Sequence, residues 1–238
     1  MKDIKKAVEA EKEYIAHRIK GEEPFHLVDA VKECGFETLE EYFAAKREHE
    51  LSALSFEAVE TTPTKAIADV LETIARKKTR VLFADTKFTI VWNGDGSEFD
   101  REYCAKHGIP VLPIQTAGGT IVSTKGDLNI GICLPAAPGV EVEDVLRKLA
   151  EIFRKRTDKS VEIDGNDILI GGHKVLGCSA YRTNGMFMFI TPVSFSDKSE
   201  LIGNICTKRS GKTAGHIDFM SAEELRTEVA EWLKVRSI

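Results

Sequence analysis

The sequence predicts an α+β fold, in which a mixed β-sheet has flanking helices and follows a helical N-terminal segment. Three observations support this prediction. Within residues 1–60 apolar residues recur every three or four positions, which is the helical period. From about residue 79 onward the pattern changes to short runs rich in β-branched and aromatic residues. Helical patterns are set between these strand-like runs, which is typical of a mixed sheet with segregated helices.

Composition excludes several classes of protein. The 238 residues, 42% of them hydrophobic, can supply the core of one large domain, or of one domain with an appendage. With 33 basic and 38 acidic residues there is no basic excess, so nucleic acid is not an expected partner. Five widely spaced cysteines without a CxxC pair indicate neither a disulfide framework nor a thiolate zinc site. No apolar stretch approaches the roughly 18 residues of a membrane span, so a cytoplasmic location without membrane contact is predicted.

Residues 1–60 are predicted to form a helical N-terminal extension, with helices over residues 2–20, 24–35 and 38–54. Gly35 is expected to end the second helix. Thr38 and Glu41 have the spacing of a capping box for the third. The extension is a candidate for oligomerisation or for docking of a partner.

Residues 61–238 are predicted to form the main domain. Its first helix starts near Pro63 and presents Ile67, Val70, Leu71 and Ile74 to a sheet. Another helix over residues 141–157 has acids in its first turn and bases in its last, which suits the helix dipole. Further helices are expected over residues 97–108, 196–206 and 221–235. Strands are expected over residues 79–85, 88–94, 109–115, 118–124, 127–135, 160–163, 167–170, 174–182 and 186–195.

Two short stretches could carry chemistry. Gly118 and Gly119 join a strand to a strand, so they lack the helix N-terminus of a phosphate-binding loop. They form either a tight bend or a backbone surface on which a ligand lies. Lys174 follows a glycine turn and is either a solvated lysine or an ammonium directed at a ligand. His107, His173 and His216 are too scattered in the sequence to indicate a metal site.

The segments that contain these residues resemble the lipoate-protein ligase and octanoyltransferase family, which is related to biotin protein ligase. The most specific segment is "GNDILIGGHKVLGCSAYR", residues 165–182. Residues 88–132 resemble the family's strand, helix and glycine-rich hairpin, in which the strands over residues 118–124 and 127–135 would pair. With "SDKSELIGNICTKRSGK" they extend the resemblance from about Val81 to the C-terminus. The resemblance implies a tunnel for a lipoyl, octanoyl or biotinyl tail, with lipoate or octanoate as substrate. It also implies ATP and magnesium as cofactors, and a lipoyl-type domain as acceptor partner.

The resemblance assigns roles to individual residues. Lys174 takes the position of the catalytic lysine, whose ammonium holds the acyl carbonyl or phosphate oxygen. Asp167 faces the acceptor lysine or a magnesium ion. Lys208, Arg209 and Lys212 are either a solvated basic patch or, in a ligase-like fold, contacts to the phosphate or to the acceptor partner. The residues expected to bind the acyl group or the nucleotide are Gly118, Gly119, Thr120, Asn166, Asp167, Gly177, Ser179 and Ala180.

The sequence also departs from the family pattern. Where ligases of the family have two arginines, this chain has the uncharged Pro113, Ile114 and Gln115, and the expected histidine is replaced by Ser123 or Thr124. An arginine-rich glycine loop is missing, so biotin is disfavoured. The cysteines of octanoyltransferases are also missing, and Cys178 is interpreted as a packed residue rather than a nucleophile. The predicted function is therefore a lipoate-ligase-like acyltransferase, and the alternative is a ligand-binding module without phosphate chemistry.

Overall fold

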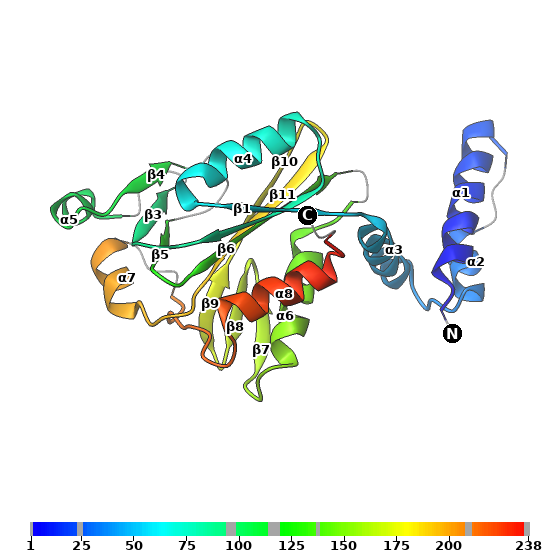
Figure 1. The fold of residues 1–238 in the computed structure, drawn as a ribbon. Coiled ribbons are helices and arrows are strands. Elements are labelled where there is room, and N and C mark those ends of the chain that lie inside the picture. The colour runs from blue at the N-terminus through cyan, green and yellow to red at the C-terminus, as the bar shows by residue number, and fades with distance from the viewer. Residues whose placement is uncertain are drawn as a thin grey trace. The chain divides into compact units, whose positions relative to one another are not determined.

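The computed structural model describes residues 2–22, 26–93, 99–113, 120–136, 139–207 and 211–235. The chain divides into two compact units (Figure 1). Unit 1 contains Met1–Leu54 with Pro138–Val140, and unit 2 contains Ser55–Ala137 with Glu141–Ile238. None of the described helices has both the length and the apolar character that crossing a bilayer requires.

Unit 1 contains three helices, α1 (Ile4–Lys20), α2 (Leu27–Glu33) and α3 (Leu39–Ala53). All three were predicted. The Thr38 hydroxyl accepts a hydrogen bond from the Glu41 amide, but the Glu41 carboxylate accepts from Glu37, so only half of the predicted capping box forms. The helices enclose a small core of their own, made of Ala7, Val31, Cys34, Phe36 and Tyr42.

The centre of unit 2 is a mixed eight-stranded sheet (Figure 1). Seven strands follow the order β1-β2-β6-β11-β9-β8-β7, and β10 pairs with β11. β1 and β2 are parallel, and the other pairs are antiparallel. The strands are β1 (Glu57–Thr61), β2 (Arg80–Asp85), β6 (Leu128–Pro135), β7 (Val161–Asp164), β8 (Asp167–Ile170), β9 (His173–Gly177), β10 (Ser179–Thr183) and β11 (Met186–Val193).

Helices cover both faces of this sheet. α4 (Pro63–Ala75) packs Val70 and Ile74 against Leu82 and its neighbours on one face. On the opposite face α8 (Ala222–Trp232) places the Arg226 guanidinium 5.2 Å from the centre of the Phe83 ring. α6 (Val142–Arg154) packs against β7, β8 and α8. Adjacent residues on β2 thus enter two separate apolar layers, which is why this strand is apolar on both faces.

A second sheet of three strands has the order β4-β3-β5. It contains β3 (Ile90–Asn93), β4 (Val111–Pro113) and β5 (Ile121–Ser123). Two short helices, α5 (Arg101–Lys106) and α7 (Ser199–Ile205), belong to the same layer. Its core contains Val91, Phe99, Cys104, Val122 and Ile205.

Several predictions about the elements were wrong. Leu71 was expected on the buried face of α4 but is 58% exposed, because the helix packs through Val70 and Ile74. The run over residues 174–182 is two strands, β9 and β10, separated at Cys178. β5 and β6 were expected to form a glycine-rich hairpin, but β5 pairs with β3 and β6 lies between β2 and β11. β1 was not anticipated, and its residues 57–60 fall in the segment assigned to the helical extension.

Candidate functional site

The candidate site is built on the β7–β8 hairpin and the adjoining strand β9. Gly165 has a φ of +62°, which suits glycine, and the turn brings Asp164 opposite Asp167. Because side chains alternate between the faces of a strand, Asp164 and Asp167 point away from the buried Ile168. Two carboxylates therefore leave the end of the hairpin on the same face.

A β-bulge brings Lys174 onto this face. Between Ile168 and Leu169 the pairing with β9 shifts, so that Leu169 lies opposite Lys174 while Asp167 lies opposite Gly177. Lys174 and Gly177 are three residues apart and would point to opposite faces of a regular strand. The extra residue of the bulge shifts the alternation of side chains by one position. Lys174 and Gly177 therefore lie on the same face of the sheet as Asp167.

Four charged side chains meet there, which we call the Asp167 cluster: Asp164, Asp167, Lys174 and Lys212. The Lys174 ammonium nitrogen lies 2.9 Å from Asp167 Oδ1. Lys212 Nζ lies 2.7 Å from Asp167 Oδ2 and 2.9 Å from Asp164 Oδ2. The Lys174 side chain is 32% exposed and that of Asp167 14% exposed, so the pair is held at the surface without being sealed off.

Gly177 leaves the space that the Lys174–Asp167 pair occupies. A Cβ at position 177 would lie 2.8 Å from Asp167 Oδ1 and 2.8 Å from both Cε and Nζ of Lys174. Real Cβ atoms essentially never approach that closely, so a side chain here must displace the pair. The glycine predicted from the resemblance therefore has a steric role at the site.

We expect Gly177→Ala to lower kcat/KM for acyl transfer by about 10²-fold, because a displacement of about 1 Å at reacting groups can cost that much. Steady-state transfer kinetics measure the effect. Gly131→Ala is the matched control: it is also a strand glycine, and its Cβ would meet Leu82 Cβ at an ordinary 3.5 Å. Equal activity of the two variants would contradict a steric role for Gly177.

The main chain of Lys174 is held by a distant segment, residues 213–215, which we call the strap. The Lys174 amide donates to the Thr213 carbonyl at 2.8 Å, and the Gly215 amide donates to the Lys174 carbonyl at 2.8 Å. A Cβ at Gly215 would lie 2.6 Å from His173 Cβ, so the close approach of the strap depends on this glycine. The strap thereby fixes both backbone groups of the predicted catalytic lysine.

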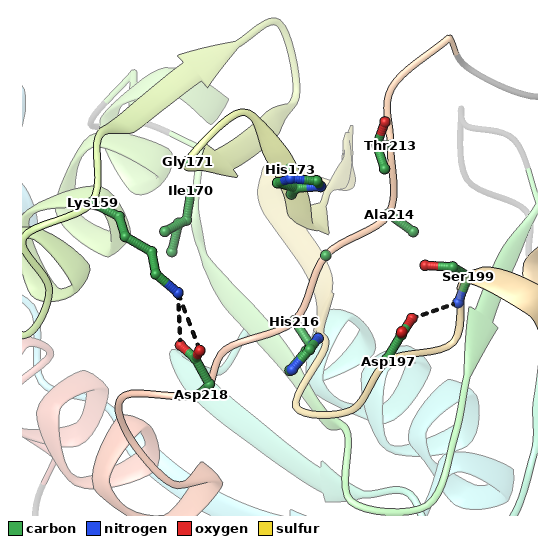
Figure 2. A pocket seen from close by; sticks show the side chains of 11 residues that line it. Lys159, Ile170, Gly171, His173, Asp197, Ser199, Thr213, Ala214, His216 and Asp218 are labelled. Carbon is green, nitrogen blue, oxygen red and sulfur yellow. Dashed lines mark hydrogen bonds and ion pairs between the residues drawn. The ribbon is translucent and has the colours of Figure 1, made fainter.

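The strap also lines a cavity of about 510 Å³ (Figure 2). His173 and His216, distant in sequence, both line it, as do Asp197 and the Lys159–Asp218 ion pair. Among the described residues no group of three histidine, cysteine or acidic side chains could hold a metal ion. The cavity is therefore not a metal centre of that kind.

Cys178 lies next to the site but is buried, with 9% of its surface exposed. Burial, with a smaller effect from Asp167, raises the pKa of its thiol to about 12. A thiol that stays protonated at neutral pH is a poor nucleophile. This agrees with its interpretation as a packed residue.

We expect Cys178→Ala to keep acyl transfer within about threefold of the wild type, because the protonated thiol takes no part in the reaction. The rate of acceptor acylation measures this. A loss of activity accompanied by loss of a hydroxylamine-sensitive acyl-enzyme would instead identify Cys178 as a thioester nucleophile.

A buried ion pair supports the turn between β5 and β6. Asp127 Oδ2 accepts from Lys198 Nζ at 2.6 Å and from the Thr124 amide at 2.8 Å. Lys198 also donates to the Val122 carbonyl at 2.8 Å, and both side chains of the pair are almost completely buried. Burial lowers the pKa of Lys198. The sequence analysis missed this pair; the available signal was the acidic Asp127 directly before the largely apolar run of residues 128–135.

The other predicted binding residues are placed as follows. Asn166 lies in the β7–β8 turn, and its carbonyl accepts from the Cys178 amide at 2.8 Å. Ser179 is 3% exposed and Ala180 is half-buried, both on β10. Thr120 directly precedes β5. Gly118, Gly119, Lys208 and Arg209 lie outside the described residues.

Magnesium at Asp167 can be tested against the geometry. Both oxygens of this carboxylate already have an ammonium within 3 Å, from Lys174 and from Lys212. A magnesium ion needs ligand oxygens at about 2.0–2.1 Å in near-octahedral geometry. The ammonium groups of Lys174 and Lys212 already balance the carboxylate charge and would repel a magnesium ion, so the arrangement does not fit a metal ligand.

The chain is similar to known proteins both in sequence and in fold. The family described as "Lipoyl protein ligase A/B catalytic domain" matches residues 87–229. A Thermoplasma acidophilum protein described as a lipoate protein ligase, solved with bound lipoic acid, is 19% identical with a TM-score of 0.60; the match covers 76% of this chain and 86% of that one. Lipoate-protein ligase A bound with ATP is 17% identical with a TM-score of 0.59, covering 77% and 87%.

A third solved structure comes from an archaeal lipoylation system. It is a bi-partite lipoate protein ligase from T. acidophilum, reported with its E2 lipoyl domain. It is 17% identical with a TM-score of 0.60, and the match covers 77% of this chain and 84% of that one. A search of curated proteins found no match. The structural likenesses confirm the predicted mixed-sheet fold with flanking helices.

Proposed function

The chain belongs to the lipoyl protein ligase A/B catalytic-domain family, and from this membership we propose that it attaches a lipoyl or related medium-chain acyl group to an acceptor lysine. The observation that carries the proposal is the setting of Lys174. Its ammonium is partly exposed, paired with Asp167, and adjoined by a glycine without a side chain. Both its backbone amide and its backbone carbonyl are hydrogen-bonded to the strap. An immobilised ammonium of this kind is suited to stabilising negative charge on an acyl or phosphate oxygen.

The proposed reaction has two steps. The carboxylate of the acid attacks the α-phosphorus of ATP, forming an acyl-adenylate and releasing pyrophosphate. The neutral amine of the acceptor lysine then attacks the acyl carbon, AMP leaves with the electrons of the broken C–O bond, and the nitrogen loses a proton as the amide forms. Lys174 would donate hydrogen bonds to the oxygens on which charge develops in either step.

ATP and lipoate as substrates are supported by relatives of the same fold, since one solved structure contains ATP and another lipoic acid. A lipoyl domain as acceptor is supported by the archaeal system that includes one. A magnesium ion bound with ATP and the individual binding residues remain predictions, as do a cytoplasmic location and the division at residue 60. The uncharged Pro113, Ile114 and Gln115 favour the second candidate, a module that binds the acid without phosphate chemistry.

Thermal unfolding of the full chain with lipoate, octanoate or biotin, each with and without Mg-ATP, tests the proposal. A ligand that binds the folded state alone raises the melting temperature by mass action. We expect lipoate or octanoate to raise it, and Mg-ATP to increase that shift. Mass spectrometry of a lipoyl domain incubated with the same mixture should show acylation of one lysine. A shift with the acid that ATP does not change, without acylation, would favour the binding module.

A further inference from the structure

We propose that the ammonium of Lys212 takes the place of a divalent cation at Asp167. The family resemblance leads to the expectation of a metal at this carboxylate, but the structure has a lysine there. The inference concerns the same site as the proposed function and in that sense rests on it. Its test measures metal binding by the protein without substrate. The replacement of a metal ion by Lys212 can therefore be contradicted while acyl transfer stands, and the reverse.

The oxygen atoms around Lys212 match the donors of an ammonium group. Its Nζ lies 2.7 Å from Asp167 Oδ2, 2.9 Å from Asp164 Oδ2 and 3.0 Å from the Asp164 carbonyl. An ammonium has three N–H donors and no acceptor, so three oxygens are what it can satisfy. Carboxylate and carbonyl oxygens are also the ligands that hard divalent cations prefer. The β7–β8 hairpin therefore offers a set of cation ligands, and Lys212 fills it.

The charges of the Asp167 cluster balance only when Lys212 is included. Two carboxylates face two ammonium groups, those of Lys174 and Lys212. Without Lys212 the cluster would contain two carboxylates and one ammonium. Its net negative charge would then attract a cation from solution.

The position of Lys212 in the chain explains how it remains there. It directly precedes the strap, whose first residue, Thr213, accepts the backbone hydrogen bond of Lys174. Further along, the Ile217 amide donates to the Ser194 carbonyl at 2.8 Å, and the Ile217 side chain is buried. The segment that presents Lys212 is thus tied to β9 and to the end of β11. Because the chain itself supplies this cation, the two carboxylates need no metal ion from solution.

The proposal makes a gain-of-function prediction. Lys212→Ala should bind Mn²⁺ roughly tenfold more tightly than the wild type, because removing the ammonium leaves the two carboxylates and the carbonyl as ligands. Electron paramagnetic resonance of free Mn²⁺, titrated with the full-length protein in the absence of nucleotide, measures this. The double variant Lys212→Ala/Asp167→Asn should return to the wild-type level. Lys212→Ser provides the same test if the alanine variant does not fold, as judged by circular dichroism.

Lys159→Ala is the matched control. Lys159 also pairs with a carboxylate, Asp218, at 3.1 Å, but this pair lies beside the cavity of Figure 2 and involves one aspartate. It should gain no Mn²⁺ binding. Two outcomes would overturn the proposal. One is wild-type binding of Mn²⁺ that Asp167→Asn abolishes, since the metal would then displace Lys212. The other is a folded Lys212→Ala that binds no more Mn²⁺ than the wild type.

Discussion

Lys174→Ala is expected to reduce acyl transfer by about 10²–10³-fold, the loss typical when one preorganised donor to a developing oxyanion is removed. The ammonium is the reactive end of this residue, whereas its backbone bonds to Thr213 and Gly215 survive the substitution. The loss should therefore appear in kcat as well as in kcat/KM, measured as acylation of a lipoyl domain. The melting temperature should change little, since the side chain is 32% exposed and fills no core.

Lys159→Ala serves as the control for charge, because it also removes one lysine that is paired with an aspartate. It should transfer the acyl group at the wild-type rate. A Lys174→Ala protein that retains full transfer would eliminate the mechanism proposed for this residue. A protein that loses transfer only because it unfolds would be recognised by its circular dichroism and melting curve.

Asp127→Ala is expected to have the largest effect on stability, about 3–5 kcal/mol, because breaking a buried pair leaves an uncompensated charge. Asp127 is 1% exposed, and its carboxylate accepts from Lys198, from the Thr124 amide and from the Phe195 amide. All of these donors would lose their acceptor at once. Urea denaturation should show the transition midpoint falling while the slope is unchanged.

Asp218→Ala is the matched control, since it breaks the exposed Lys159–Asp218 pair and should cost no more than about 1 kcal/mol. The double variant Asp127→Ala/Lys198→Met should recover part of the loss, because it removes the stranded ammonium together with its partner. An Asp127→Ala protein as stable as the wild type would mean that Lys198 reaches water or another acceptor in the folded state.

Most of the fold could be predicted because its signals are local. Pro63 begins α4 as expected, and the helix predicted over residues 221–235 starts at a capping box formed by Ser221 and Glu224. β1 was missed because five residues with mixed exposure have no clear period. The hairpin expected of β5 and β6 is absent because each strand pairs with strands that are distant in the sequence, β5 with β3 and β6 with β2 and β11.

The candidate site was predictable in part. The segment over residues 165–182 brings together Asp167, Lys174 and Gly177 through neighbouring strands, which a sequence motif can indicate. It could not indicate the bulge that aligns them, since a bulge depends on pairing with β8. Nor could it show that Lys212, 45 positions from Asp167, completes the cluster, because that contact arises only when the strap docks.

The strap determines when the site can exist during synthesis of the chain. Chains are made from the N-terminus, and segments fold as they become available. Lys174 and Asp167 leave the ribosome long before residues 211–217, which supply both backbone partners of Lys174 and the second cation of the cluster. A nascent or truncated chain that ends before the strap contains Lys174 but lacks the backbone hydrogen bonds and the Lys212 contact that complete the site. Translation of the strap therefore decides when the site can assemble.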